Sequence, residues 1–189
     1  MIILEGPDGG GKTTLIKKIQ ERYPELEVAP RVVSKDTEAL TDMQEWVNRN
    51  LSEGPQYKLF DRHRLISEFI YGPILRTQQH PGFNSPIWVH HSLRRFRELR
   101  PVVIYCIPPL EVVMANIVGD EDNQRVWDHI MGIHAAYIHR ASLDSLTGNF
   151  YQGVHSMIYD YTTDGQEADP LGPLHLAINN MYGRTHNND

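Results

Sequence analysis

The sequence predicts an α/β fold, a three-layer α/β/α sandwich built around a five-stranded parallel sheet. Short apolar runs alternate with longer stretches in which apolar residues recur at helical spacing, as expected when strands and helices alternate. The run Val102 to Ile107 is apolar throughout, which is typical of a parallel strand covered on both faces. At 189 residues, 40% of them hydrophobic and 22% charged, the chain has the size and composition of one domain spanning 1–189.

The first part of the chain is predicted to alternate between strands and helices. We expect strands over 1–4, 28–33 and 57–60, and helices over 12–23 and 40–51. Leu15, Ile16 and Ile19 share one face of the first helix, and Pro30 interrupts the second strand. Gly54-Pro55 ends the second helix, because neither residue favours helix propagation.

The rest of the chain continues the alternation. We expect a helix that starts with the apolar residues at 65, 66, 69 and 70, and further helices over 85–100, 110–117 and 171–181. We also expect a long helix from Val126 through Tyr137, strands over 102–107 and 157–161, a turn at 164–165 and a frayed tail over 183–189. Pro73 should kink or cut the first of these helices. Ser85-Pro86 supplies an N-cap and a first-turn proline for the second.

Charge and cysteine content indicate the class of protein and its compartment. Eighteen Lys and Arg against twenty-four Asp and Glu leave a net charge of −6, which disfavours an architectural nucleic-acid binder but leaves room for a local basic groove. Four arginines before the fourth strand form a solvated helix face or a phosphate-binding patch: Arg94, Arg95, Arg97 and Arg100. A single cysteine, Cys106, and the lack of a signal-peptide pattern or a long apolar run predict a cytoplasmic protein without membrane spans.

The strongest motif is a glycine-rich loop after the first strand. Residues 6–13 read Gly-Pro-Asp-Gly-Gly-Gly-Lys-Thr, which fits the P-loop pattern G-x-x-x-x-G-K-[ST] between a strand and a helix. Glycines let backbone N–H groups converge on a polyphosphate, and the following helix adds positive potential. The residues expected to bind ATP are Gly6, Asp8, Gly9, Gly10, Gly11, Lys12, Thr13 and Thr14. Lys12 would contact the phosphates and Thr13 would coordinate Mg²⁺, so the fold prediction narrows to the P-loop NTPase type.

Other motifs distinguish between the classes of P-loop protein. The chain has neither an Asn-Lys-x-Asp segment, which GTPases use to read guanine, nor the signature of a transporter ATPase. Asp61 and Arg62 instead follow the third strand, at the sheet edge where ligands of parallel sheets gather. They form either a substrate-binding pair or a structural ion pair.

Two segments of the chain resemble motifs of a known family. Residues 5–14, Glu-Gly-Pro-Asp-Gly-Gly-Gly-Lys-Thr-Thr, resemble the loop of thymidylate kinases, and Asp61-Arg62-His63 with Ser67 resembles their Asp-Arg-Tyr/His segment. Deoxynucleoside kinases have a related Glu-Arg-Ser at that place. The resemblance implies that Asp8 faces the acceptor sugar and that Arg62 holds the acceptor phosphate, a bidentate task that suits a guanidinium.

The remaining candidate site residues each have more than one candidate role. Asp61 would lie beside the reacting centre, where it would orient the acceptor, bind Mg²⁺ through water or act as a base. Phe69 and Tyr71 would stack on an acceptor base, the alternative for Phe69 being a place in the core. Members of the family close an arginine-bearing lid, and we expect a short lid over about 118–126 with Arg125 as its catalytic arginine. The alternative for Arg125 is an exposed helix residue, and the family's arginine repeat is missing.

These features predict an ATP- and Mg²⁺-dependent kinase for a small acceptor, a thymidylate-like deoxynucleoside monophosphate. A second hypothesis within the enzymes is a hydroxyl acceptor, either a deoxynucleoside or a hydroxymethylated pyrimidine in DNA, on which related P-loop kinases of bacterial viruses act. A hypothesis from another class is a nucleotide-binding regulatory module without transfer activity. A homodimer is left open.

Overall fold

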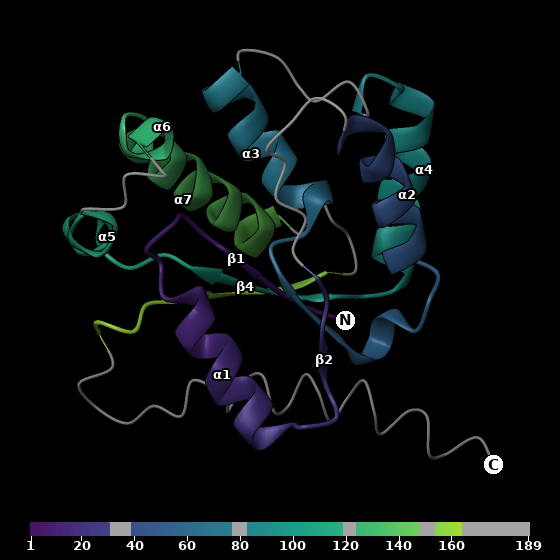
Figure 1. Cartoon of the computed structure of the whole chain (residues 1–189), viewed down its shortest axis with the longest axis horizontal. Coiled ribbons are helices and arrows are strands. Elements are labelled where there is room, and N and C mark those ends of the chain that lie inside the picture. Colours follow the sequence, from purple (N-terminus) through teal and green to yellow (C-terminus); the bar gives the residue numbers. More distant parts are fainter. Residues whose placement is uncertain (31–38, 77–82, 119–123, 148–153, 164–189) are drawn as a thin grey trace.

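The computed structural model describes residues 1–30, 39–76, 83–118, 124–147 and 154–163. Strands and helices alternate along the chain, as Figure 1 shows. The elements are β1 (Ile2–Glu5), α1 (Lys12–Arg22), β2 (Glu27–Val28), α2 (Ala39–Asn50), the 3₁₀ helix η1 (Pro55–Tyr57), β3 (Lys58–Asp61), α3 (Arg64–Arg76), α4 (Pro86–Glu98), β4 (Val102–Cys106), α5 (Leu110–Ile117), α6 (Gln124–Trp127), α7 (Ile130–Thr147) and β5 (His155–Tyr159).

The five strands form one parallel sheet in the order β2-β3-β1-β4-β5. The first strand is therefore central: Ile2 pairs with Leu59 on one side and with Val102 on the other. All carboxyl ends point to one edge, so the loop after β1 and the turn after β3 lie next to each other. This confirms the predicted α/β class and the five-stranded parallel sheet.

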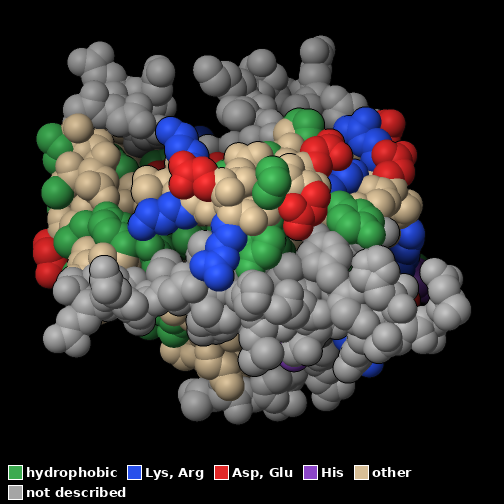
Figure 2. Space-filling view, turned by 90° about the horizontal axis from the view of Figure 1, so that it is seen from below, with side chains coloured by type: hydrophobic (Ala, Val, Ile, Leu, Met, Phe, Trp, Pro, Cys, Tyr) green, Lys and Arg blue, Asp and Glu red, His purple; other side chains and the backbone are tan. Residues whose placement is uncertain are grey.

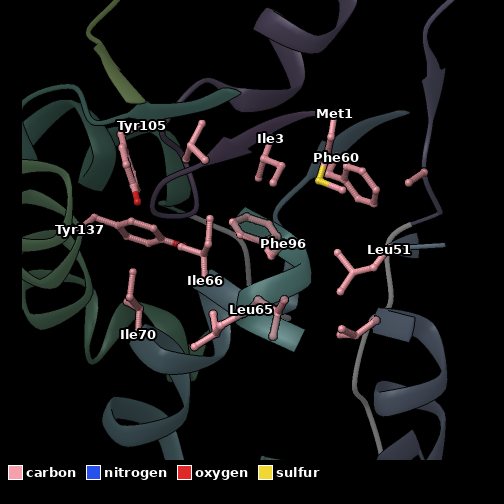
Figure 3. Packing of buried hydrophobic residues seen from close by; sticks show 14 of the residues in the cluster. Met1, Ile3, Leu51, Phe60, Leu65, Ile66, Ile70, Phe96, Tyr105 and Tyr137 are labelled. Atoms are coloured by element: carbon pink, nitrogen blue, oxygen red, sulfur yellow. The ribbon is translucent and has the colours of Figure 1, made fainter. Parts of the chain in front are cut away.

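Each strand divides its side chains between two hydrophobic layers, because successive residues point to opposite faces. Ile2 and Leu4 pack with α1 on one face, and Ile3 packs on the other face with α2, α3, α4 and α7. Figure 1 shows α1 below the sheet and the larger helical layer above it, and Figure 3 shows that layer's packing, in which Phe96 of α4 and Phe60 of β3 belong to the same buried cluster. Helices on both faces complete the predicted three-layer sandwich.

Two helices differ from the prediction. Pro73 does not cut α3, which continues through it to Arg76, because Pro73 sits on the exposed side while Ile70 and Leu75 pack against the core on either side of it. The long helix predicted from Val126 is divided into α6 and α7. Its break is a tightened turn, in which the N–H of His129 bonds to the Val126 carbonyl three residues earlier.

Strand β2 is shorter in the described residues than the predicted span of 28–33. The remainder of that span, most of the predicted lid, the turn at 164–165, the helix at 171–181 and the tail at 183–189 lie outside the described residues.

The surface carries charges of both signs. On the face seen in Figure 2, Lys and Arg side chains alternate with Asp and Glu side chains over the described residues. None of the helices in the described part of the chain combines the length and the hydrophobicity of a transmembrane segment.

Candidate active site

The P-loop connects β1 to α1 with a backbone that only glycine accommodates well. Gly6 has a φ of 142°, and a Cβ there would lie 2.2 Å from the carbonyl oxygen of Cys106. Gly11, the N-cap of α1, has a φ of 84°. Both positions explain why the sequence needs glycine, since L side chains rarely adopt these conformations. The loop thereby reaches the N-terminus of α1, where unpaired N–H groups favour anions.

Lys12 points back across this loop. Its Nζ is buried and donates to the carbonyl oxygens of Gly6 at 3.1 Å and Pro7 at 2.6 Å. Burial, together with the nearby Arg62 charge, lowers the pKa of Lys12 to about 8. An arriving phosphate would strengthen its protonation, since an anion favours the charged form. Thr13 and Thr14 follow on the exposed first turn of α1.

Arg62 reaches the same loop from the end of β3. Its Nη2 donates to the Gly6 carbonyl at 3.1 Å and its Nε to the same oxygen at 3.3 Å. The residue has a φ of 67°, in the left-handed region that residues other than glycine rarely enter. Its side chain is only 11% exposed, so the guanidinium is held in a fixed place beside the P-loop.

Asp8 and Tyr71 complete a compact cluster around this guanidinium. Asp8 Oδ1 lies 2.9 Å from Arg62 Nη2, which also donates to the Tyr71 hydroxyl at 2.6 Å. That hydroxyl donates to Asp8 Oδ2 at 2.9 Å, and the guanidinium carbon lies 4.6 Å from the centre of the Tyr71 ring. Burial alone would raise the pKa of Asp8, but the Arg62 and Lys12 charges and these hydrogen bonds hold it below its ordinary value. The structure thus brings together three residues predicted for acceptor binding.

Glu5 is a part of the site that sequence reasoning did not assign. This fully buried carboxylate ends β1 and accepts hydrogen bonds from the His63 backbone N–H at 2.7 Å and from the Tyr137 hydroxyl at 2.9 Å. Burial raises its pKa to about 7, against the lowering effect of these bonds and of Arg62. An acidic residue at the end of a wholly apolar strand was the available signal; nothing local marks Tyr137.

Asp61 and Thr13 offer oxygen atoms for a magnesium ion. Asp61 ends β3, and its charge raises the pKa of Lys12, so the two groups interact electrostatically. Within the described residues, no three His, Cys, Asp or Glu side chains come together as a metal-binding group. One carboxylate and one hydroxyl next to a phosphate-binding loop nevertheless fit Mg²⁺, which usually combines one or two protein oxygens with substrate phosphates and water.

Helix α5 and the segment after β5 contact the other side of the P-loop. Asn116 Nδ2 donates to the Gly9 carbonyl at 2.8 Å and to the Tyr161 hydroxyl at 2.7 Å. The Tyr161 ring lies close to Gly11, where a Cβ would come within 2.7 Å of it. Sequence reasoning did not identify Asn116, because its partners Gly9 and Tyr161 lie 107 and 45 residues away along the chain.

Two predicted site residues make their described contacts elsewhere. The Phe69 ring packs edge-to-face on Phe83, with centroids 5.6 Å apart, at the border of the larger hydrophobic core. Arg125 is exposed and donates through Nη2 to the Leu75 carbonyl at the end of α3. Their assignments to acceptor stacking and to phosphoryl transfer therefore stay predictions.

No protein-family model and no curated protein matches this chain in sequence. Comparison with solved structures does find similar folds. The YorR protein of Bacillus subtilis, in complex with phosphorylated GDP, aligns with a TM-score of 0.67 and 16% identity over 97% of both chains. Deoxyadenosine kinase from M. mycoides, with dCTP bound, aligns with a TM-score of 0.56 and 16% identity over 97% of this chain and 100% of that one. The complex of the same kinase with dATP aligns with a TM-score of 0.53 and 14% identity, over 96% of this chain and 98% of that one. At 14–16% identity, these likenesses show the fold alone.

Proposed function

We propose that this chain is a kinase that transfers the γ-phosphoryl group of ATP to a deoxynucleotide-type acceptor, a thymidylate-like deoxynucleoside monophosphate. The observation that carries the proposal is the position of Arg62, whose guanidinium is held against the Gly6 carbonyl of the P-loop between Asp8 and Tyr71. A donor phosphate chain on the P-loop and an acceptor phosphate on Arg62 would meet at this point. The resemblance to thymidylate kinases and the kinase among the similar folds support the same activity.

The residues have distinct tasks in this reaction. An acceptor phosphate oxygen forms a bond to the γ-phosphorus while the bond from that phosphorus to the β,γ-bridging oxygen breaks, leaving ADP and a nucleoside diphosphate. Lys12 balances charge on the transferred group, and Arg62 orients the acceptor phosphate. Bound Mg²⁺, held through Thr13 and Asp61, would neutralise the phosphate oxygens. Asp8 faces the acceptor sugar.

A hydroxyl acceptor is the second candidate, favoured by the deoxyadenosine kinase among the similar folds and by the Asp61 carboxylate at the end of β3. A hydroxyl must lose a proton as the new bond forms, and Asp61 would accept it as a general base. A monophosphate is largely ionised at neutral pH and needs no base. The two candidates therefore differ in what they demand of Asp61.

The arginines of α4 bear on a DNA acceptor. Arg94 pairs with Glu98 at 3.0 Å, and Arg95 donates to the Ser52 hydroxyl at 2.8 Å. These contacts favour the interpretation as a solvated helix face, so a hydroxymethylated pyrimidine in DNA enters the test only as one acceptor among several.

The test supplies labelled ATP with deoxynucleosides, deoxynucleoside monophosphates and hydroxymethylated duplex DNA. We expect transfer to a monophosphate, with loss in Lys12→Met and retention in Lys17→Met, an exposed lysine of the same helix that serves as the matched control. Transfer only to a nucleoside, or only to DNA, would establish the hydroxyl-acceptor alternative. ATP binding without transfer to any acceptor would leave a nucleotide-binding module.

Asp61→Asn then separates the first two candidates. With a hydroxyl acceptor, turnover should be abolished while ATP still binds, since no other group is assigned to take the proton. With a monophosphate, residual turnover should remain. Unchanged turnover would remove Asp61 from the mechanism.

A further inference from the structure

A buried carboxylate interacts electrostatically with Arg62, the arginine that the proposed function uses. Glu5 is fully buried, and each of its oxygens accepts one hydrogen bond, from the His63 backbone N–H at 2.7 Å and from the Tyr137 hydroxyl at 2.9 Å. The donors come from the turn after β3 and from α7, so three separate parts of the chain meet at one side chain. None of the tasks in phosphoryl transfer described above requires this group.

The turn that Glu5 holds is strained. Arg62 adopts a φ of 67°, a conformation that persists in residues other than glycine only where the surroundings determine it strongly. Two hydrogen bonds from consecutive backbone amides hold this conformation: the Arg62 N–H donates to the Leu4 carbonyl at 2.9 Å, and the His63 N–H donates to Glu5. The turn directs the Arg62 side chain to the Gly6 carbonyl.

We infer that Glu5 is a positioning residue: its carboxylate holds the turn at Arg62 and His63 so that the Arg62 guanidinium stays against the P-loop, and Tyr137 fixes that carboxylate from α7. Strain at Arg62 is thereby balanced by a bond to the neighbouring amide, and the guanidinium keeps its place without a ligand-dependent rearrangement. The kinetic part of this inference rests on the proposed function, whereas the structural part does not.

Glu5 changes charge in an accessible pH range, which supplies a readout. Its pKa is raised to about 7 by burial. The titratable groups that interact with it come from several elements around it: Arg62 after β3, Tyr137 on α7, Lys12 on α1, Tyr71 on α3 and Cys106 on β4. The His63 N–H donates directly to Glu5, so its chemical shift should follow this titration in the wild-type protein.

The structural test measures hydrogen exchange of the Arg62 Nε–H by NMR, with the resonance assigned by its loss in Arg62→Lys. The Nε–H donates to Gly6 and should be protected. Glu5→Gln keeps the size of the side chain but removes the charge and one acceptor. We expect the Arg62 Nε–H to exchange about tenfold faster in this variant, because the turn opens more often. The pH titration of the His63 amide should also disappear.

Tyr137→Phe provides a second variant should Glu5→Gln fail to fold. Its matched control is Tyr105→Phe, because Tyr105 is an equally buried tyrosine of the same core whose hydroxyl donates to Asp144 instead. Figure 3 shows the two tyrosines near each other. We expect faster exchange of the Arg62 Nε–H in Tyr137→Phe than in Tyr105→Phe; equal rates in the two folded variants would overturn the role of Tyr137.

The kinetic test compares acceptor and ATP parameters. Glu5→Gln should raise the acceptor KM about tenfold, while the KM for ATP stays within about twofold. The ratio of wild-type to variant kcat/KM should change through pH 7; the second ionisation of the acceptor phosphate cancels in that ratio. Wild-type protection of Arg62 and a wild-type acceptor KM in folded Glu5→Gln would overturn the inference. Should the wild-type protein transfer phosphate to no acceptor, the proposed function fails, and hydrogen exchange alone decides the positioning role.

Discussion

His63 makes the stability of this protein depend on pH in a way that can be isolated. The side chain is fully buried, with its ring 5.2–5.3 Å from those of Trp46, Phe60 and Phe96. Its Nδ1 accepts the Leu65 N–H at the start of α3, so the imidazole is neutral with its proton on Nε2. Protonation would place a charge among aromatic rings and remove that acceptor.

The structure determines the sign and the size of the effect. Burial, aided by the nearby Arg64 charge, lowers the pKa of His63 to about 3, from the model-peptide value of 6.5. Between these values the unfolded chain binds more protons than the folded protein, so stability is fully present above pH 6.5 and is lost as pH falls toward 3. The linkage relation gives a loss of about 2 kcal/mol at pH 5 and about 3 kcal/mol at pH 4.

Two other buried groups titrate nearby and must be cancelled. The pKa of Glu5 is raised to about 7, so the stability it contributes at low pH is lost as pH rises through 7, opposite to His63. The pKa of the Met1 amino group is lowered to about 5 by burial, so it acts in the same direction as His63. A variant that retains both groups removes their contributions by subtraction.

His63→Asn is that variant, since an Asn side chain at the same place can still accept the amide at the start of α3. Urea denaturation followed by circular dichroism at pH 7.5 and pH 5 measures both proteins. We expect the wild type to exceed the variant in stability at pH 7.5 through aromatic contacts, by about 1–3 kcal/mol. The difference should shrink by about 2 kcal/mol at pH 5. A difference that is the same at both pH values refutes a neutral, buried His63.

Gly6→Ala brings a Cβ to 2.2 Å from the Cys106 carbonyl oxygen at a φ of 142°, and denaturation should show a loss of at least about 2 kcal/mol. Gly132→Ala, in α7 with open space around the added Cβ, should gain about 0.5–1 kcal/mol in the same assay, and a loss there would contradict this account. Ser85→Ala removes the side-chain acceptor at the start of α4; a thermal melt should show a loss of about 0.5–1 kcal/mol, and an unchanged Tm would mean that the cap contributes nothing. Asp8→Asn should lower the acceptor kcat/KM about tenfold with ATP binding intact, and a wild-type value would remove Asp8 from the acceptor site.

The parts of the site that the sequence predicted are those in which neighbouring residues act together. The P-loop lies in one short segment between an apolar strand and a helix, so its position follows from local pattern. Asp61 and Arg62 were predicted beside it because the carboxyl ends of parallel strands share one edge, and the ion pair between Arg62 and Asp8 agrees with that placement.

The parts that the sequence did not predict depend on how distant elements dock. Apolar periodicity marks Tyr137 as a core residue, but its hydroxyl bond to Glu5 follows only from the placement of α7 on the sheet. Asn116 likewise reaches Gly9 because α5 packs against the loop. Periodicity also continues across the turn at His129, so the break between α6 and α7 left no mark in the spacing of apolar residues.

The central place of β1 has a consequence for the kinetics of folding. Its partners, near Leu59 and Val102, are synthesised long after it, so the strand cannot pair until much of the chain exists. Pairing of segments so distant in sequence closes large loops and slows folding to milliseconds or longer. Until then an apolar strand with two open edges is exposed to other chains. The segment that positions the phosphate-binding loop is therefore also prone to aggregation while the protein is being made.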